Sequence, residues 1–171
     1  MRLEGQRVYL VPLSAAELLL AVENYGELQC RLGLKDTAAA LDEEMQYAMT
    51  VRRRKVLQDQ ENFLWLTNWA IVHSEERCII GFVILKGPKE KGEVIAGYVI
   101  DEDYRRQGYA TEALQVITEW ILSDPRVLYV VADTEKDNVA SHKVLEHLGA
   151  QRFQETDDLV WWRIAKSGIS S

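Results

Sequence analysis

The chain has 171 residues, of which 47% are hydrophobic and 27% charged, and its formal net charge is −7. These proportions exclude a disordered or fibrous protein, and the length predicts one domain with a single core. The acidic balance argues against nucleic-acid binding, because neutralised phosphates supply most non-specific affinity, and it favours cationic partners such as amines.

The N-terminal part predicts one strand and two helices. Residues 7–13 alternate and contain β-branched and aromatic side chains, which is typical of a strand. Ser14 and Glu17 have capping-box spacing, so a helix is expected from Ala15 to about Tyr25. A second helix is expected from about Thr37 to Gln60, where acidic residues come early and basic residues late.

Three apolar runs follow, separated by short segments rich in turn residues. The runs are 64–73, 78–86 and 93–100. Such short connections join antiparallel neighbours, so the pattern predicts a three-strand meander.

The next helix is predicted from a stripe of apolar residues at four-three-four spacing, and Asp124-Pro125 ends it. The stripe consists of Ala110, Leu114, Ile117 and Ile121. Residues 127–132 are all apolar, as in a strand that is buried on both faces. Strand, helix and strand together predict a right-handed βαβ crossover.

The C-terminal part predicts a helix capped by Asn138 and ended by Gly149, then a hairpin of residues 151–155 and 159–164. The fold class is therefore α+β. We expect a mostly antiparallel sheet of about seven strands with one parallel βαβ crossover, flanked by about four helices. It forms one domain over residues 1–166, and residues 167–171 form a C-terminal tail.

Several other classes of protein are not favoured. The longest apolar run broken only by glycine, residues 78–85, is shorter than the roughly 20 residues that cross a bilayer. The N-terminus has no apolar segment of a signal peptide, so we expect a cytoplasmic protein without a membrane partner. Cys30 and Cys78 lie far apart and the histidines do not cluster, so no metal site is expected.

Residues 103–112, between the third meander strand and the following helix, are the most informative segment. They contain two arginines and place Gly108 and Ala110 two positions apart. Successive backbone N–H groups at such a helix start form an anion cradle, and small side chains let a phosphate approach. The alternative is a plain strand-to-helix turn that uses Gly108 for its backbone freedom.

Two ordered motifs resemble the GCN5-related N-acetyltransferase (GNAT) superfamily. Residues 105–110 match its R/Q-x-x-G-x-G/A signature, and 108–113 (Gly-Tyr-Ala-Thr-Glu-Ala) resemble the branch of RimJ and RimL types, the ribosomal-protein N-terminal acetyltransferases. Residues 137–149 resemble that branch's N-x-x-S … L-x-x-L-G helix, although Ala150 replaces the usual aromatic residue. Residues 79–82 are similar to the family's second meander strand.

The resemblance implies the GNAT fold and an N-acetyltransferase that moves the acetyl group of acetyl-coenzyme A to a primary amine. The acceptor would be a protein N-terminus or a small amine, attacking directly in a ternary complex, and a homodimer stays open. The pyrophosphate would rest on the loop, and a backbone N–H near Val99 or Ile100 would polarise the thioester. The implied coenzyme-binding residues are Val99, Ile100, Arg105, Arg106, Gln107, Gly108, Tyr109, Ala110, Thr111, Asn138 and Ser141.

The chemistry requires a base for the ammonium and an acid for the departing thiolate. Ser141 matches the family position near the sulfur and is the first choice for the acid; the alternative is an ordinary helix-start residue. The usual acid before Gly97 is absent, so Glu93 is the candidate base, with a water or a carboxylate of the N-terminal half as alternatives. Tyr98 and Tyr104 are further hydroxyls, but Tyr98 is expected to pack in the core.

Two other functions remain open. The first is a non-catalytic GNAT fold that binds coenzyme A as a regulatory module. The second is a nucleic-acid partner for the basic run 52–55, although a solvated helix face is favoured there. Acceptor choice is expected to lie in the N-terminal helices and around Trp65, Trp161 and Trp162.

Overall fold

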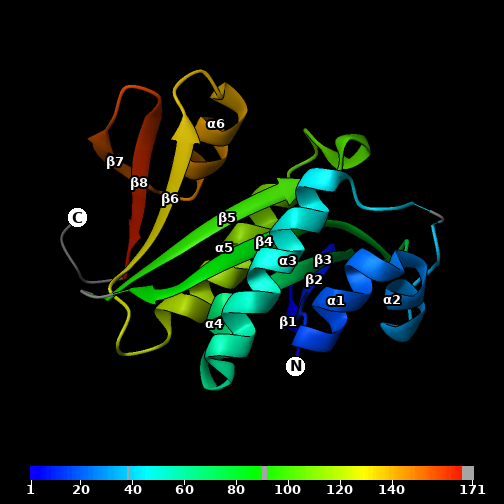
Figure 1. Cartoon of the computed structure of the whole chain (residues 1–171). Helices are drawn as coiled ribbons and strands as arrows, with labels where there is room; N and C mark the ends of the chain where they lie inside the picture. The colour runs from blue at the N-terminus through cyan, green and yellow to red at the C-terminus, as the bar shows by residue number, and fades with distance from the viewer. Residues whose placement is uncertain (38, 90–91, 167–171) are drawn as a thin grey trace.

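The computed structural model describes residues 1–37, 39–89 and 92–166, which form an eight-stranded sheet in the order β1-β2-β3-β4-β5-β6-β8-β7 (Figure 1). Its strands are β1 (Leu3–Glu4), β2 (Val8–Pro12), β3 (Asn68–His73), β4 (Cys78–Lys89), β5 (Glu93–Ile100), β6 (Tyr129–Glu135), β7 (Gln151–Glu155) and β8 (Leu159–Ala165). The α-helices are α1 (Ala15–Glu23), α2 (Tyr25–Arg31), α3 (Glu43–Gln58), α4 (Phe63–Leu66), α5 (Tyr109–Leu122) and α6 (Val139–His147), and short 3₁₀ turns are η1 (Gln60–Asn62) and η3 (Glu102–Tyr104).

The pairing confirms the predicted α+β class. Strands β3, β4 and β5 form the antiparallel meander, and β5 pairs with β6 in parallel through the crossover helix α5. Strands β7 and β8 form the closing hairpin. The predicted tail, residues 167–171, lies outside the described residues.

Two layers of helices cover the sheet. Helices α1, α2 and α3 lie on one face and α5 lies on the other (Figure 1). Helix α5 buries Leu114, Ile117 and Ile121 of the predicted stripe, as a helix that packs on a sheet must. Among the described residues, no helix combines the length and apolar character that crossing a membrane requires.

Some predicted boundaries are wrong, for local reasons. The helix expected from Thr37 begins at Glu43, because Asp42 caps it by accepting a hydrogen bond from the Met45 N–H at 2.8 Å. Ala38 of that predicted helix lies outside the described residues. The strand expected over 127–132 begins at Tyr129 and continues to Glu135. Strand β1 and helix α2 were not predicted.

The structure also differs from the prediction around the tryptophans. Residues 64–66, expected to open a strand, lie in helix α4 instead, and the Trp65 ring stacks on Trp120 of α5 at 4.7 Å between ring centroids. Trp162 is 2% exposed and its indole N–H donates to the Thr134 hydroxyl at 2.9 Å. Both rings therefore pack in the core. The acceptor choice that the sequence places around these tryptophans stays a prediction.

Strands β5 and β6 diverge after a short contact, and this positions the site. They pair only from Glu93 to Ile95, opposite Tyr129 to Val131. Beyond that point β6 pairs with β8 alone, so one edge of Ala96 to Ile100 has no strand partner in the described chain. Figure 1 shows the resulting V between β5 and β6, with α6 beside its open end.

Candidate active site

A cleft of about 800 Å³ opens where β5 and β6 separate. Its walls are the end of β5, the following loop, and the first turns of α5 and α6. It brings together ten of the predicted coenzyme-binding residues: Val99, Ile100, Arg105, Arg106, Gly108, Tyr109, Ala110, Thr111, Asn138 and Ser141. Gln107 does not line the cleft; its side-chain amide donates to the Asp103 carbonyl at 3.0 Å.

The loop presents free amides at the start of α5. Within the described chain, no N–H of residues 106–111 donates a hydrogen bond, and the first helical one runs from Glu112 to the Gly108 carbonyl at 3.1 Å. Arg106 and Gly108 have φ angles of 63° and 84°, a left-handed geometry that glycine adopts without cost. Unpaired amides at a helix start attract anions, so this loop has the form of a phosphate cradle.

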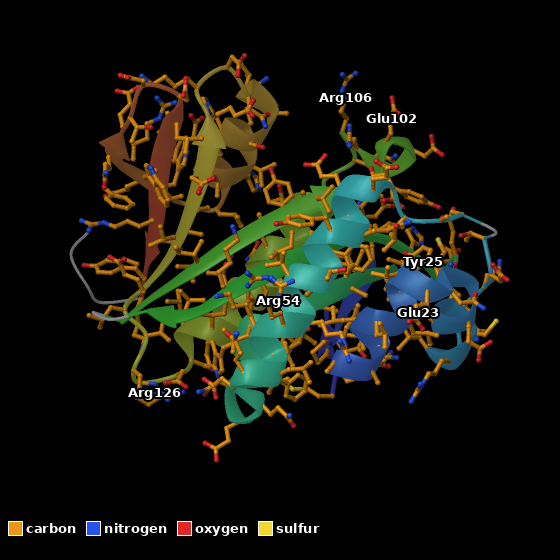
Figure 2. All side chains as sticks on the ribbon, in the orientation of Figure 1. Glu23, Tyr25, Arg54, Glu102, Arg106 and Arg126 are labelled. Atoms are coloured by element: carbon orange, nitrogen blue, oxygen red, sulfur yellow. The ribbon has the colours of Figure 1, made fainter. Side chains whose placement is uncertain are left out.

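The two arginines of the loop have different surroundings. The Arg105 side chain turns back toward β5, and its Nε donates to the Ile100 carbonyl at 2.8 Å. Arg106 is exposed, and Figure 2 shows it extending from the outer corner of the molecule that also carries Glu102. Arg105 therefore ties the loop to the strand, whereas Arg106 has a free charge at the mouth of the cleft.

The register of β5 decides which of its amides faces the cleft. The Asp101 N–H donates to the Ile80 carbonyl at 2.8 Å, on the β4 side. Hydrogen-bonding direction alternates along an antiparallel strand, so the Val99 amide also faces β4 and the Ile100 amide faces the open side. The Ile100 carbonyl, which Arg105 binds from the loop, agrees with this direction. Of the two predicted oxyanion donors, the geometry favours Ile100.

A pair of hydroxyl groups joins β5 to α6 at the cleft. Ser141, on the first turn of α6, accepts a hydrogen bond from the Tyr98 hydroxyl at 3.0 Å, and both residues line the cleft. Burial raises the pKa of Tyr98, and the bond with Ser141 opposes this less strongly. The phenol therefore stays protonated at neutral pH. The ring packs against the core as expected, and its hydroxyl also reaches the site; the sequence did not predict that it pairs with Ser141.

Asn138 has the predicted capping role. Its side-chain oxygen accepts a hydrogen bond from the Ser141 N–H at 3.1 Å, which starts α6 and fixes the position of Ser141. Replacing Asn138 with alanine is expected to lower the free energy of unfolding by about 1 kcal/mol through the lost cap. Chemical denaturation checks this value, and Asn138→Asp, which retains a capping oxygen, is the control that should restore stability.

The structure does not bring Glu93 to the cleft. Glu93 is the first residue of β5, and Tyr98 follows five positions later, roughly 17 Å along an extended strand. Asp101 does not line the cleft either, but it directly follows Ile100 at the end of β5 that borders the cleft. Burial raises the pKa of its carboxyl and Arg105 opposes the rise. Asp101 also approaches α2, since its charge adds to burial in raising the pKa of Tyr25.

Comparison with known proteins agrees with this geometry. The family described as Acetyltransferase (GNAT) domain matches residues 7–151. The uncharacterized N-acetyltransferases YjdG and YnaD of Bacillus subtilis (strain 168) are 34% identical over 97 residues and 26% identical over 82 residues. These matches cover 56% and 48% of this chain, and the chain spans 58% and 48% of the two relatives' lengths.

Solved structures share the fold at low identity. The ribosomal-protein-S5-alanine acetyltransferase of Vibrio fischeri has a TM-score of 0.72 and 15% identity, with both chains covered completely. RimL, a ribosomal L7/L12 alpha-N-protein acetyltransferase solved with coenzyme A, has a TM-score of 0.68 and 15% identity over 96% of this chain and 98% of its own. The family match spans most of the chain and includes the loop and the V-shaped opening, so this chain belongs to the GNAT acetyltransferase family.

Proposed function

We propose that this protein is an N-acetyltransferase that transfers the acetyl group of acetyl-coenzyme A to a primary amine by direct attack in a ternary complex. The observation that carries the proposal is the shared cleft, which is lined both by the loop with the unpaired amides of residues 106–111 and by the Tyr98–Ser141 hydroxyl pair. A phosphate cradle alone would suit many ligands. A cradle, a free strand edge and a proton donor together suit a thioester of coenzyme A.

The coenzyme would extend along three surfaces. Its pyrophosphate would accept hydrogen bonds from the loop amides, and its pantetheine arm would pair with the free edge of β5 beside Ile100. A second groove, of about 920 Å³, is lined by α5, α6 and residues 4–6, and it shares Gly108, Thr111, Lys143 and Val144 with the cleft. This groove would receive the nucleotide end, where Lys143 offers a positive charge to a phosphate.

The residues of the cleft, together with Asp101 at the end of β5, would supply the parts of the reaction. The amine nitrogen bonds to the thioester carbon, and the Ile100 N–H stabilises the negative charge that develops on the carbonyl oxygen. As the carbon–sulfur bond breaks, Ser141 donates a proton to the thiolate and Tyr98 returns a proton to Ser141; Tyr98 then regains its proton from solvent. Asp101 replaces Glu93 as the candidate base for the ammonium proton, because it lies beside Ile100 and its raised pKa suits proton transfer.

Coenzyme A is expected to raise the melting temperature of the protein. A ligand that binds only the folded state stabilises it by mass action, about 2.7 kcal/mol at a concentration 100 times its Kd. A thermal-shift titration with coenzyme A measures the effect, and adenosine, which lacks the pyrophosphate, is the matched ligand control. An absence of any shift at millimolar coenzyme A would refute coenzyme binding in every form.

Acetyl transfer itself is tested with a panel of amines and free-thiol detection of released coenzyme A. The panel includes peptides with free N-termini, because the relatives of similar fold include ribosomal-protein acetyltransferases, and it includes small amines that suit an acidic protein. Release of thiol that depends on an amine supports the enzyme. Coenzyme binding without transfer to any amine supports the non-catalytic module.

A further inference from the structure

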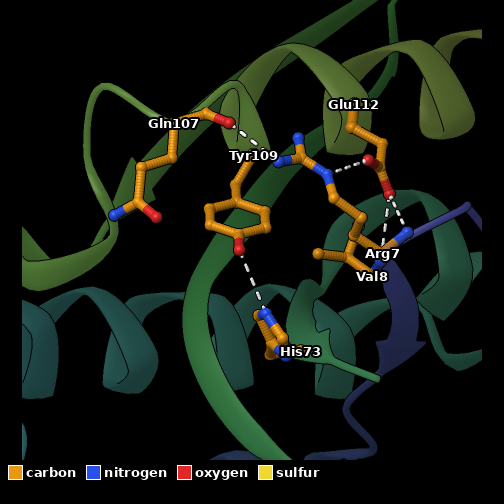
Figure 3. Close-up of polar contacts among 6 residues, drawn as sticks. All are labelled: Arg7, Val8, His73, Gln107, Tyr109 and Glu112. Carbon is orange, nitrogen blue, oxygen red and sulfur yellow. Dashed lines mark hydrogen bonds and ion pairs between the residues drawn. The ribbon is translucent and has the colours of Figure 1, made fainter. Parts of the chain in front are cut away.

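Arg7, which comes directly before β2, contacts the coenzyme loop a hundred residues away in the sequence. Its Nη1 donates to the Gln107 carbonyl at 2.9 Å, and its Nε donates to Glu112 Oε1 at 2.9 Å (Figure 3). Its guanidinium also lies over the Tyr109 ring, 4.3 Å from the centroid. One side chain therefore holds the residues on both sides of Gly108 as well as the first turn of α5.

The contact with Gln107 fixes the direction of the next amide. In a trans peptide the carbonyl oxygen and the following N–H point in opposite directions, and the described chain has no cis bond. The Gln107 carbonyl points to Arg7, so the Gly108 N–H points away from Arg7. Gly108 lines the cleft, and its N–H is one of the free amides of the cradle.

Glu112 in turn holds Arg7 in place. Glu112 Oε2 accepts hydrogen bonds from the backbone N–H groups of Arg7 and Val8 at 2.7 and 3.0 Å. Partial burial tends to raise the pKa of Glu112, but these bonds and the Arg7 guanidinium together lower it, so the carboxylate stays charged. The start of β2 is thereby bonded to the first turn of α5 through backbone as well as side chain.

Tyr109 is fixed from its other end. Its hydroxyl lies 3.0 Å from His73 Nε2, and the Glu76 N–H donates to His73 Nδ1 at 3.0 Å. Since Nδ1 accepts, the neutral imidazole carries its hydrogen on Nε2 and donates to Tyr109. The Tyr109 ring, over which Arg7 lies, is thus bonded to strand β3, and this contact helps to fix the position of the Arg7 guanidinium.

We propose that Arg7 is a positioning residue for the coenzyme, which orients the Gln107–Gly108 peptide so that the Gly108 N–H faces the pyrophosphate. The inference rests on the proposed function, since it needs coenzyme A to bind in the cleft. It assigns to the N-terminal strand, outside the loop motif, a part in coenzyme affinity. The guanidinium acts through its fork of donors, so lysine, which has one charged nitrogen, cannot replace it.

The test compares Arg7→Gln with Arg2→Gln, by calorimetric titration with coenzyme A. Arg2 is a matched control on the same N-terminal hairpin: it pairs with Glu4 and lies 3.9 Å over the ring of Tyr9, but it does not touch the loop. Arg7→Gln is expected to weaken coenzyme A binding at least about 10-fold, because small misplacements of binding groups are costly. Arg2→Gln removes the same charge and is expected to leave the affinity within about twofold.

Two further measurements separate positioning from a general loss of charge or of fold. Arg7→Lys keeps the charge. If its coenzyme A affinity is nearer to that of Arg7→Gln than to that of the wild type, the guanidinium donors are needed and the positioning role is supported. Full rescue by lysine overturns the positioning role. In the wild type, saturating coenzyme A should move the Gly108 amide resonance downfield as a phosphate hydrogen bond forms. In Arg7→Lys this movement should be reduced, and an equal movement overturns the proposal. If the wild type fails to bind coenzyme A, the proposed function fails first.

Discussion

Gly108→Glu is expected to abolish coenzyme A binding while the protein without ligand still folds. The new carboxylate would place a negative charge in a cradle of amides that holds a pyrophosphate. The substitution is also strained, because Gly108 has a φ of 84° and an added Cβ would lie 3.2 Å from Arg7 Nη2. Calorimetric titration with coenzyme A, up to millimolar concentration, measures the loss, and circular dichroism monitors the fold.

The matched control for the backbone strain is Gly149→Glu. Gly149 has nearly the same φ, 80°, at the end of α6, but an added Cβ would meet no atom within 4 Å. A left-handed residue other than glycine costs about 1 kcal/mol, so both variants should lose stability by similar amounts. Gly149→Glu should still bind coenzyme A. Wild-type affinity in Gly108→Glu would show that the loop does not hold the phosphates.

The features that were predicted correctly are those that depend on neighbours in the sequence. The capping box of Ser14 and Glu17, the cap of Asn138 and the turn at Gly108 are each fixed within a few residues. The short connections of the meander leave antiparallel pairing as the simple solution. Eight coenzyme-binding candidates named from the two motifs line one cleft, together with Val99 and Ile100 of β5.

The features that were missed depend on contacts between distant residues. The pair Arg7–Glu112 and the pair Tyr98–Ser141 join different elements, and neither residue of a pair indicates the other in the sequence. Helix α4 replaced the start of a predicted strand, where the Trp65 ring stacks on Trp120 across the fold. The choice of Glu93 used the alternation along β5 but not the strand rise, which already separates Glu93 from the end of the strand.

Ser141→Ala is expected to lower turnover by about 10² to 10⁴, the usual contribution of a positioned acid, while coenzyme A affinity stays within about threefold. Tyr98→Phe keeps the ring in its packing and removes the donor to Ser141, so it should lower turnover in the same direction. The two hydroxyls act as one unit, so the double variant should be no slower than Ser141→Ala alone. Tyr129→Phe, on β6 outside the cleft lining, controls for loss of a phenol.

The loss of turnover in Ser141→Ala is expected to depend on pH in one direction. Burial raises the pKa of Tyr98 above its ordinary value of about 10, so in the wild type the pair keeps its proton as the amine becomes deprotonated. In Ser141→Ala the departing thiolate must take a proton from solution, where protons become scarcer as pH rises. The ratio of wild-type to Ser141→Ala turnover should therefore stay constant or increase from pH 6 to about pH 9. A ratio that falls toward one across this range would mean that Ser141 only starts α6, and that another group protonates the sulfur.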